Sequence, residues 1–166
     1  MIFINQKNSF IAFCTKFIGV IVLYYLLISI NYISQLITQL TILSSGISVF
    51  FMKLFDSSVN SYQNYILSES HTIQVGFGCE GTEPVALLCA GILAFPVNYK
   101  KKIPAIIIGS SLLLLINQLR IIGLFYLTKH NPDLFSLIHN DIFPLITVIC
   151  SALIFITWIK TMKKRL

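Results

Sequence analysis

Long apolar stretches dominate this chain of 166 residues and limit what it can fold into. Four of them, at residues 10–30, 82–97, 103–127 and 142–159, approach or exceed the roughly 20 residues that cross a hydrocarbon core about 30 Å thick. Since 56% of the residues are hydrophobic and only 11% are charged, a water-soluble fold is excluded. We expect an all-α integral membrane protein with four transmembrane helices, forming a single membrane-embedded domain over residues 1–166.

The basic residues cluster beside the apolar stretches. Lys7 and Lys16 accompany the first stretch, a block at residues 100–102 precedes the third, and a block at residues 160–165 follows the fourth. Because lysine and arginine are enriched in cytoplasmic loops, we expect all three clusters on the cytoplasmic side of the inner membrane of a multi-pass protein. The net charge of +6 then reflects topology, and no folded basic surface remains that could bind nucleic acid.

Residues 10–30 could alternatively be a secretory signal peptide. The apolar run is long for such a signal, and Ser29, Ile30 and Asn31 make a poor small-residue cleavage site. We therefore interpret this stretch as the first membrane span.

Residues 31–55 divide into two faces at helical spacing. The apolar face carries Ile33, Leu36, Leu40, Leu43, Ile47, Phe50 and Leu54, and the polar face carries Ser34, Gln35, Thr38, Gln39, Thr41, Ser45 and Ser48. Such a helix lies in the membrane interface or packs on the bundle, so we expect one amphipathic interfacial helix here. Residues 56–78 are more polar, and short alternations at 62–67 and 72–75 predict a small external hairpin or loop.

Three reactive side chains fall on the outer side of this topology. Cys79 lies just before the second span, Arg120 lies about 26 Å along the third span at 1.5 Å per residue, and His139 closes the external loop before the fourth span. Glu80 and Glu83 follow the cysteine closely and could shape the site. A thiolate nucleophile, an imidazole acid or base and an oxyanion-stabilising guanidinium are the groups that acyl transfer requires. The sequence therefore predicts attack on an amide at the outer membrane face.

Each of the three residues also has an ordinary explanation. A helix N-terminus after Cys79 favours its thiolate, but Cys79 could be a simple loop cysteine. Arg120 inside a span is costly unless it meets a partner or a polar cavity, which Asn117 one turn earlier could provide; it could also extend to the outer interface. His139 alone is equally compatible with a solvated surface.

The other cysteines and histidines are expected to be structural or exposed. A thiol inside an apolar span behaves as a small buried hydrophobe, and histidines of polar loops lie at the surface. These residues are Cys14, Cys89 and Cys150, and His71 and His130. No metal-ligand spacing, glycine-rich phosphate loop, heme signature or HExxH motif is present in the sequence, so we predict neither a cofactor nor a metal.

Together these residues resemble the exosortase/archaeosortase family of membrane transpeptidases. The resemblance covers about residues 70–160, and its motifs arrive in the family's order and at its approximate spacing. They are Gly78-Cys79-Glu80-Gly81-Thr82-Glu83-Pro84 with Ala94-Phe95-Pro96, then Asn117-Gln118-Leu119-Arg120-Ile121-Ile122 with Leu124-Phe125-Tyr126, then His139.

The resemblance implies a cysteine peptidase or transpeptidase that cleaves the C-terminal sorting signal of exported proteins, made of a short motif, a transmembrane helix and a basic tail. Cys79 would be the nucleophile that forms a thioester, Arg120 would stabilise the oxyanion, and His139 would shuttle the proton to the leaving amine. A lipid or polysaccharide amine at the surface would then accept the exported protein.

The chain departs from the family at Glu80, where a small or amide-bearing residue is common, and a carboxylate there would raise the thiol pKa. Two other classes of function stay open. In a permease or carrier subunit for small solutes, Arg120 would bind an anion and Cys79 would be incidental. In a structural subunit of a secretion complex, Cys79 would not react with an external thiol probe, and Arg120 would be unexplained.

Overall fold

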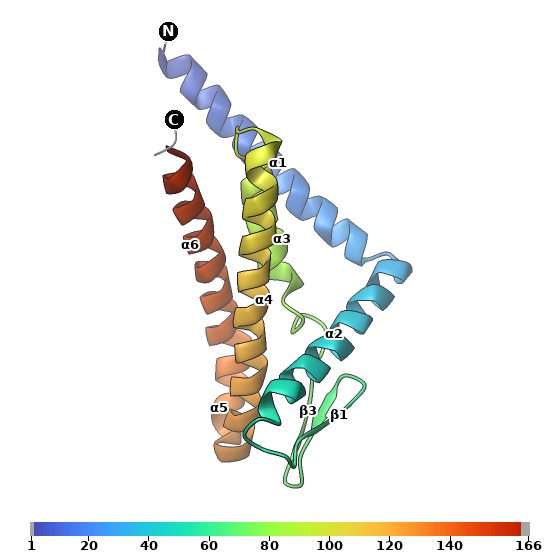
Figure 1. The fold of residues 1–166 in the computed structure, drawn as a ribbon. Coiled ribbons are helices and arrows are strands. Elements are labelled where there is room, and N and C mark those ends of the chain that lie inside the picture. The colour runs from blue at the N-terminus through green and yellow to red at the C-terminus, as the bar shows by residue number, and fades with distance from the viewer. Residues whose placement is uncertain (1, 164–166) are drawn as a thin grey trace.

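Long helices make up most of the structure (Figure 1). The computed structural model describes the backbone of residues 2–163 and the side chains of residues 9–162 except 129, 132 and 133. The elements in chain order are α1 (Ile2–Ile28), α2 (Asn31–Met52), β1 (Asn60–Tyr62), β2 (Tyr65–Leu67), β3 (Thr72–Gln74), α3 (Thr82–Ala94), α4 (Tyr99–His130), α5 (Pro132–Leu137), the π-helical turn η1 (Ile138–Ile142) and α6 (Phe143–Lys163). The prediction of an all-α integral membrane protein is confirmed.

Four described helical segments are long and apolar enough to cross a membrane. They are Ser9–Ile28, Asn31–Met52, Tyr99–Thr128 and Leu134–Met162. Three of them contain or closely match spans expected from the sequence. The expected span at residues 82–97 is shorter, because α3 has 13 residues and is only about 20 Å long. Helix α2, which was expected at the interface, has 22 residues and is by length and composition also able to cross a membrane.

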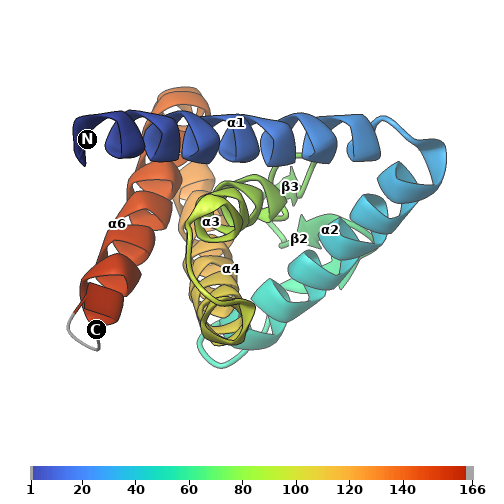
Figure 2. The ribbon, with the colours of Figure 1, turned by 90° about the horizontal axis from the view of Figure 1, so that it is seen from above.

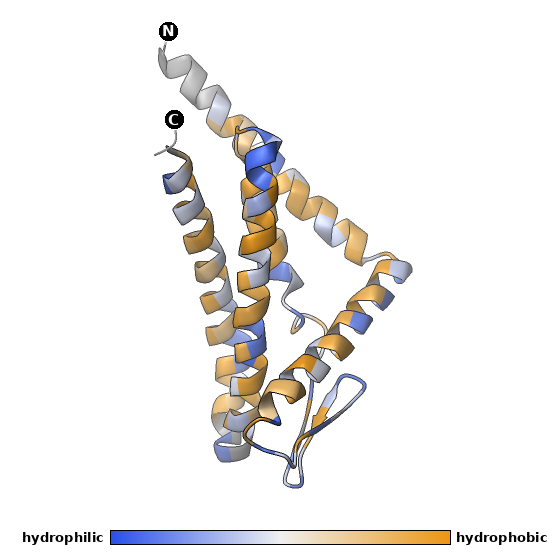
Figure 3. Ribbon diagram, viewed as in Figure 1, coloured by the Kyte–Doolittle hydropathy of each residue, from blue (hydrophilic) through white to orange (hydrophobic). Residues whose placement is uncertain are grey.

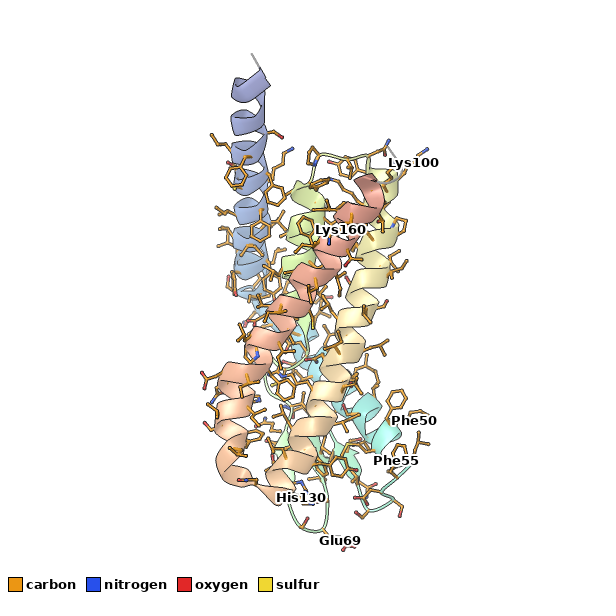
Figure 4. The ribbon with its side chains drawn as sticks, turned by 90° about the vertical axis from the view of Figure 1, so that its left-hand side faces the viewer. Phe50, Phe55, Glu69, Lys100, His130 and Lys160 are labelled. Atoms are coloured by element: carbon orange, nitrogen blue, oxygen red, sulfur yellow. The ribbon has the colours of Figure 1, made fainter. Side chains whose placement is uncertain are left out.

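The start of α4 and the end of α6, which carry lysine blocks, lie at the same end of the molecule. α1 descends from the end that holds the N-terminus, and α2 continues to the opposite end, so together they make one passage along the molecule (Figure 1). Lys100 and Lys160 lie at the N-terminal end, whereas Glu69 and His130 lie at the other (Figure 4). Lys100 and Lys160 thus lie on one side, as expected for their two clusters from the charge pattern.

The short helix α3 lies at the centre of the bundle, surrounded by α1, α2, α4 and α6 (Figure 2). It joins a cluster of buried side chains made of Leu88, Ile92, Leu113, Trp158 and Met162. A Cβ on Gly109 would lie 2.6 Å from Leu88 Cδ2, so the glycine lets α4 approach α3 closely. Helices in membranes associate largely through such close packing of small residues.

The C-terminal half of the amphipathic helix α2 is turned with its polar residues inward. Ser44, Ser45 and Ser48 are buried, whereas Leu43 and Phe50 are 58% and 67% exposed. Hydrophobic residues also line the outer faces of the long helices (Figure 3). An outward apolar face is the arrangement expected of a helix that packs on a bundle within lipid, since lipid accepts apolar side chains and the interior satisfies polar ones.

The expected hairpin is a three-stranded antiparallel sheet in the order β1-β2-β3. A tight turn with Gln63 at φ 52° divides the alternation at residues 62–67 into two strands. Ile66 and Val75 are buried with Met52 of α2 and Phe125 of α4, which fixes the sheet against both helices.

His71 also connects the sheet to α4. Its Nε2 lies 3.0 Å from the Phe125 carbonyl oxygen, and the two rings lie 4.3 Å apart. The expectation that His71 is a surface residue is therefore wrong, because its side chain is partly buried at this junction. His130 is exposed, as expected.

Candidate active site

The loop that carries Cys79 is fixed in place by hydrogen bonds and by two glycines. Gly78 and Gly81 have φ values of 85° and 84°, which L side chains rarely adopt. The Cys79 N–H donates to the Gly76 carbonyl at 3.0 Å, and Asn117 Nδ2 donates to the Cys79 carbonyl at 2.7 Å. A Cβ on Gly81 would lie 2.9 Å from Asn117 Cγ, so only glycine allows this approach of the loop to α4.

Two polar side chains support this loop. Asn117 was expected to give Arg120 a partner or a polar cavity, and its amide donates to the backbone of Cys79. The residue before α3 is Gly81, and the Thr82 hydroxyl in the first turn of the helix donates to Glu80 Oε1 at 2.8 Å. Both hydrogen bonds strengthen the connection between the cysteine loop and its supporting helices.

His139 lies next to the Cys79 thiol. Its Nε2 lies 4.0 Å from Cys79 Sγ, and its ring stacks on Phe135 with centroids 5.2 Å apart and planes 9° from parallel. The residue lies in η1, which continues into α6, so the expectation of a loop histidine is wrong. π-helical turns recur at functional sites because they locally redirect side chains. The contact lets the imidazole receive the thiol proton after a small movement.

Arg120 supplies a buried positive charge at the same place. It is 8% exposed, its Nε has no hydrogen-bond partner, and its guanidinium carbon lies 5.8 Å from the Phe143 ring centroid. Among the described side chains, which leave out residues 129, 132 and 133, no ion pair is found for it. Arg120, Cys79 and His139 line one small cavity. The structure therefore brings the three predicted residues together.

The surroundings of Cys79 favour the protonated thiol. Burial raises the thiol pKa, the positive charge of Arg120 and the hydrogen bond with the Gly76 backbone lower it, and the carboxylates of Glu80 and Glu83 raise it; the net shift is upward. The net shift is opposite to the one expected from the helix N-terminus, because burial is the largest cause. The expected effect of Glu80 on the thiol pKa is present, although burial is the larger cause.

The two carboxylates occupy different places. Glu80 is 2% exposed and its Oε2 has no partner, while a hydrogen-bond chain connects its other oxygen through Thr82 to the Tyr24 hydroxyl at 2.8 Å. Glu80 also lines a groove between α2 and α4. Glu83 is exposed and lines a separate cavity between α1, α3 and α6, which Arg120 also lines. Only Glu80 is thus part of the buried support for the loop.

Sequence reasoning missed two residues of the site. Phe135 orients the His139 ring, and the four-residue spacing between them would have indicated this pair if a helix had been predicted there. Tyr24 reaches the cysteine loop from α1, 58 residues away from Thr82, and no local pattern signals such a contact.

The other cysteines lie in the helices where they were expected. Cys14, Cys89 and Cys150 belong to α1, α3 and α6, and all four cysteines are free thiols. Among the described residues, no group of three or more histidine, cysteine or acidic side chains could hold a metal ion.

Comparison with known proteins identifies the family. The family model "Transmembrane exosortase (Exosortase_EpsH)" matches residues 8–156. A curated relative, "Probable archaeosortase E" of Methanocaldococcus jannaschii, is 29% identical over 140 residues, which cover 81% of this chain and 70% of the relative. No solved structure matches the chain significantly. Because the family model covers most of the chain, including the cysteine loop, α4 and η1, the protein belongs to the transmembrane exosortase family.

Proposed function

We propose that this protein is a membrane cysteine transpeptidase that cleaves exported proteins at a C-terminal sorting signal and transfers them to a surface acceptor. Family membership supports a role in protein sorting. The observation that carries the specific chemistry is the cavity shared by Cys79, His139 and Arg120, with Cys79 Sγ 4.0 Å from His139 Nε2.

Acylation begins when the substrate carbonyl enters this cavity. His139 Nε2 takes the thiol proton, and Cys79 Sγ attacks the carbonyl carbon to form a tetrahedral oxyanion. The buried guanidinium of Arg120 stabilises the negative oxygen. His139 then gives its proton to the leaving amine, the C–N bond breaks, and a thioester on Cys79 remains.

Transfer reverses the proton movements. The amine of a lipid or polysaccharide acceptor attacks the thioester carbon, His139 takes the proton from the attacking nitrogen, and a second oxyanion forms beside Arg120. Its collapse expels Cys79 as the thiolate, which recovers its proton from His139. The product carries a new amide bond, and the enzyme returns to the protonated form that the buried surroundings of Cys79 favour.

The arrangement of charges supports a location in the cytoplasmic membrane with the site on the outer side. Lys100 and Lys160 lie at one end, and η1 lies beside α5 at the opposite end (Figures 1 and 4). A substrate with an apolar helix and a basic tail would then have its tail at the lysine end and its cleavage motif near Cys79.

Replacement of the cysteine in the native host tests this function. Cys79→Ala should leave the sorting signals attached to their proteins, so that mass spectrometry of the membrane fraction finds uncleaved C-terminal tails. The matched control is the triple variant Cys14→Ala, Cys89→Ala, Cys150→Ala, which should process substrates normally because these thiols lie in other helices. If the protein were a carrier or a structural subunit, processing would be the same in both variants. Unchanged processing in Cys79→Ala would refute the proposal.

A further inference from the structure

The strand β3 forms a free edge of the sheet beside Cys79. β2 pairs with β1 on one side and with β3 on the other, so β3 has no partner beyond it. The Val75 N–H donates to Asn64 at 2.8 Å and the Ser68 N–H donates to His71 at 3.0 Å. Both bonds follow the same register that pairs Ile66 with Ile73.

This register determines which backbone groups of β3 face outward. In an antiparallel ladder, hydrogen-bonded and non-hydrogen-bonded pairs alternate. Since positions 71, 73 and 75 direct their backbone groups toward β2, the N–H and C=O groups of Thr72 and Gln74 point away from the sheet. In the part of the chain that the structure describes, no hydrogen bond is found for these outward groups. They are therefore available to another strand.

The outward edge borders the candidate active site. A single cavity of about 380 Å³ is lined by Thr72 and Gln74 of β3 together with Cys79 and His139. Phe135 also lines it. The sheet edge, the thiol and the imidazole thus surround one space that could hold an extended peptide.

We propose that the substrate segment preceding the scissile bond binds as an added strand on β3, with its backbone paired to Thr72 and Gln74. This inference rests on the proposed function, because it needs Cys79 to attack a peptide. Strand addition draws affinity from main-chain hydrogen bonds, whereas side-chain pockets supply sequence preference. The edge from Thr72 to Gln74 is about 7 Å long at 3.3 Å per residue, so it positions two to three substrate residues next to the thiol.

The pairing predicts a period of two in the substrate, which can be measured without knowing the natural motif. The probe is penta-alanine chloromethyl ketone: Cys79 Sγ displaces chloride from the methylene carbon, a C–S bond forms, and the thiol proton leaves through His139 to solvent. A series of probes, each N-methylated at one amide, is reacted with the purified full chain, and the modification of Cys79 is followed by mass spectrometry. We expect N-methylation to slow alkylation at least tenfold at the two amides, two residues apart, that pair with Thr72 and Gln74, and to change it less than twofold at the others.

Substitutions on the two edge strands of the sheet provide a second test of the strand pairing. Gln74→Pro removes an outward N–H next to the site, and Ser61→Pro removes the corresponding outward N–H from the far edge on β1. We expect Gln74→Pro to slow the unmethylated probe about tenfold and Ser61→Pro to leave it unchanged, with iodoacetamide labelling of Cys79 equal in both.

Equal sensitivity at all amides, or equal rates in the two proline variants, would overturn the strand assignment. Neither result would contradict the proposed function. That function would instead be refuted by normal substrate processing in Cys79→Ala.

Discussion

Three charged side chains act on the Cys79 thiol in opposite directions. Arg120 lowers its pKa, whereas Glu80 and Glu83 raise it, and burial makes the net shift upward. Below its pKa the thiol gains reactive thiolate about tenfold per pH unit. In the proposed mechanism, the protonated Cys79 thiol therefore needs His139 as a proton acceptor.

The rate of Cys79 alkylation should therefore depend on pH, and each neighbouring charge should shift the midpoint of that dependence. In a variant with the other three cysteines replaced by alanine, the iodoacetamide rate should rise with pH, with a midpoint above that of an exposed cysteine. Glu80→Gln removes a negative charge, so the midpoint should fall and labelling at pH 8 should quicken. Arg120→Gln should move the midpoint upward. Movement of the two variants in the same direction would refute this account of the thiol.

Gly81 is expected to tolerate no side chain. Its positive φ adds about 1 to 2 kcal/mol of strain to any L residue, and a new Cβ would also displace Asn117. Gly78 has a similar φ of 85° but open space around it, so Gly78→Ala adds only the strain. Thermal unfolding in detergent should rank the variants with Gly81→Ala least stable, Gly78→Ala next, and Gly123→Ala, which has open space and no positive φ, near the parent. Equal melting temperatures for the first two would contradict the close approach of loop and helix.

At the scale of helices, α2 is held to α4 by polar contacts. Ser48 Oγ donates to Gln118 Oε1 at 2.8 Å, and both side chains are buried. Interhelical hydrogen bonds in membranes contribute about 0.6 kcal/mol on average. A double-mutant cycle with Ser48→Ala and Gln118→Leu should give a coupling energy of about that size, measured by reversible unfolding. Leu43→Ala, on the exposed face, should not couple to Gln118→Leu, and a coupling as large as that of Ser48 would contradict the inward orientation of the polar face.

The sequence was sufficient to predict the division of α2 into two faces but not their orientation. An amphipathic pattern places polar residues toward water only when water surrounds the protein, and in lipid the same pattern turns inward. The length of α3 could not be predicted either, because its apolar residues are buried at the bundle centre rather than exposed to lipid. Membrane spans bounded by lysine blocks were easier to predict, because their length and flanking charge constrain them directly.

At the scale of the whole molecule, charge topology also predicted that the three candidate residues lie at similar depth. Their actual contact depends on helix rotation and on the π-helical turn around His139. Neither feature produces a periodic pattern of residues in the sequence. Asn117 illustrates the same limit, because its distance of three residues from Arg120 suggested a pair, whereas its amide bonds the Cys79 backbone.

The orientation in the membrane can be tested with single cysteines in a background where the four native cysteines are replaced by alanine. Glu69→Cys and His130→Cys lie at the end opposite Lys100 (Figure 4). A membrane-impermeant maleimide should label both in intact cells, whereas Lys100→Cys should react only after the cells are permeabilised. The reverse pattern would place the candidate site on the cytoplasmic side.

In the proposed mechanism, Cys79 carries the substrate as a thioester, His139 transfers the proton and Arg120 stabilises the oxyanion. Rapid acid quenching of the working enzyme, followed by mass spectrometry of the Cys79 peptide, tests it most directly. We predict an acyl adduct on Cys79 that hydroxylamine removes as a hydroxamate, and at least a hundredfold slower appearance of that adduct in His139→Ala. Substrate cleavage without any hydroxylamine-sensitive adduct on Cys79, or an adduct that forms at the normal rate in His139→Ala, would contradict the account.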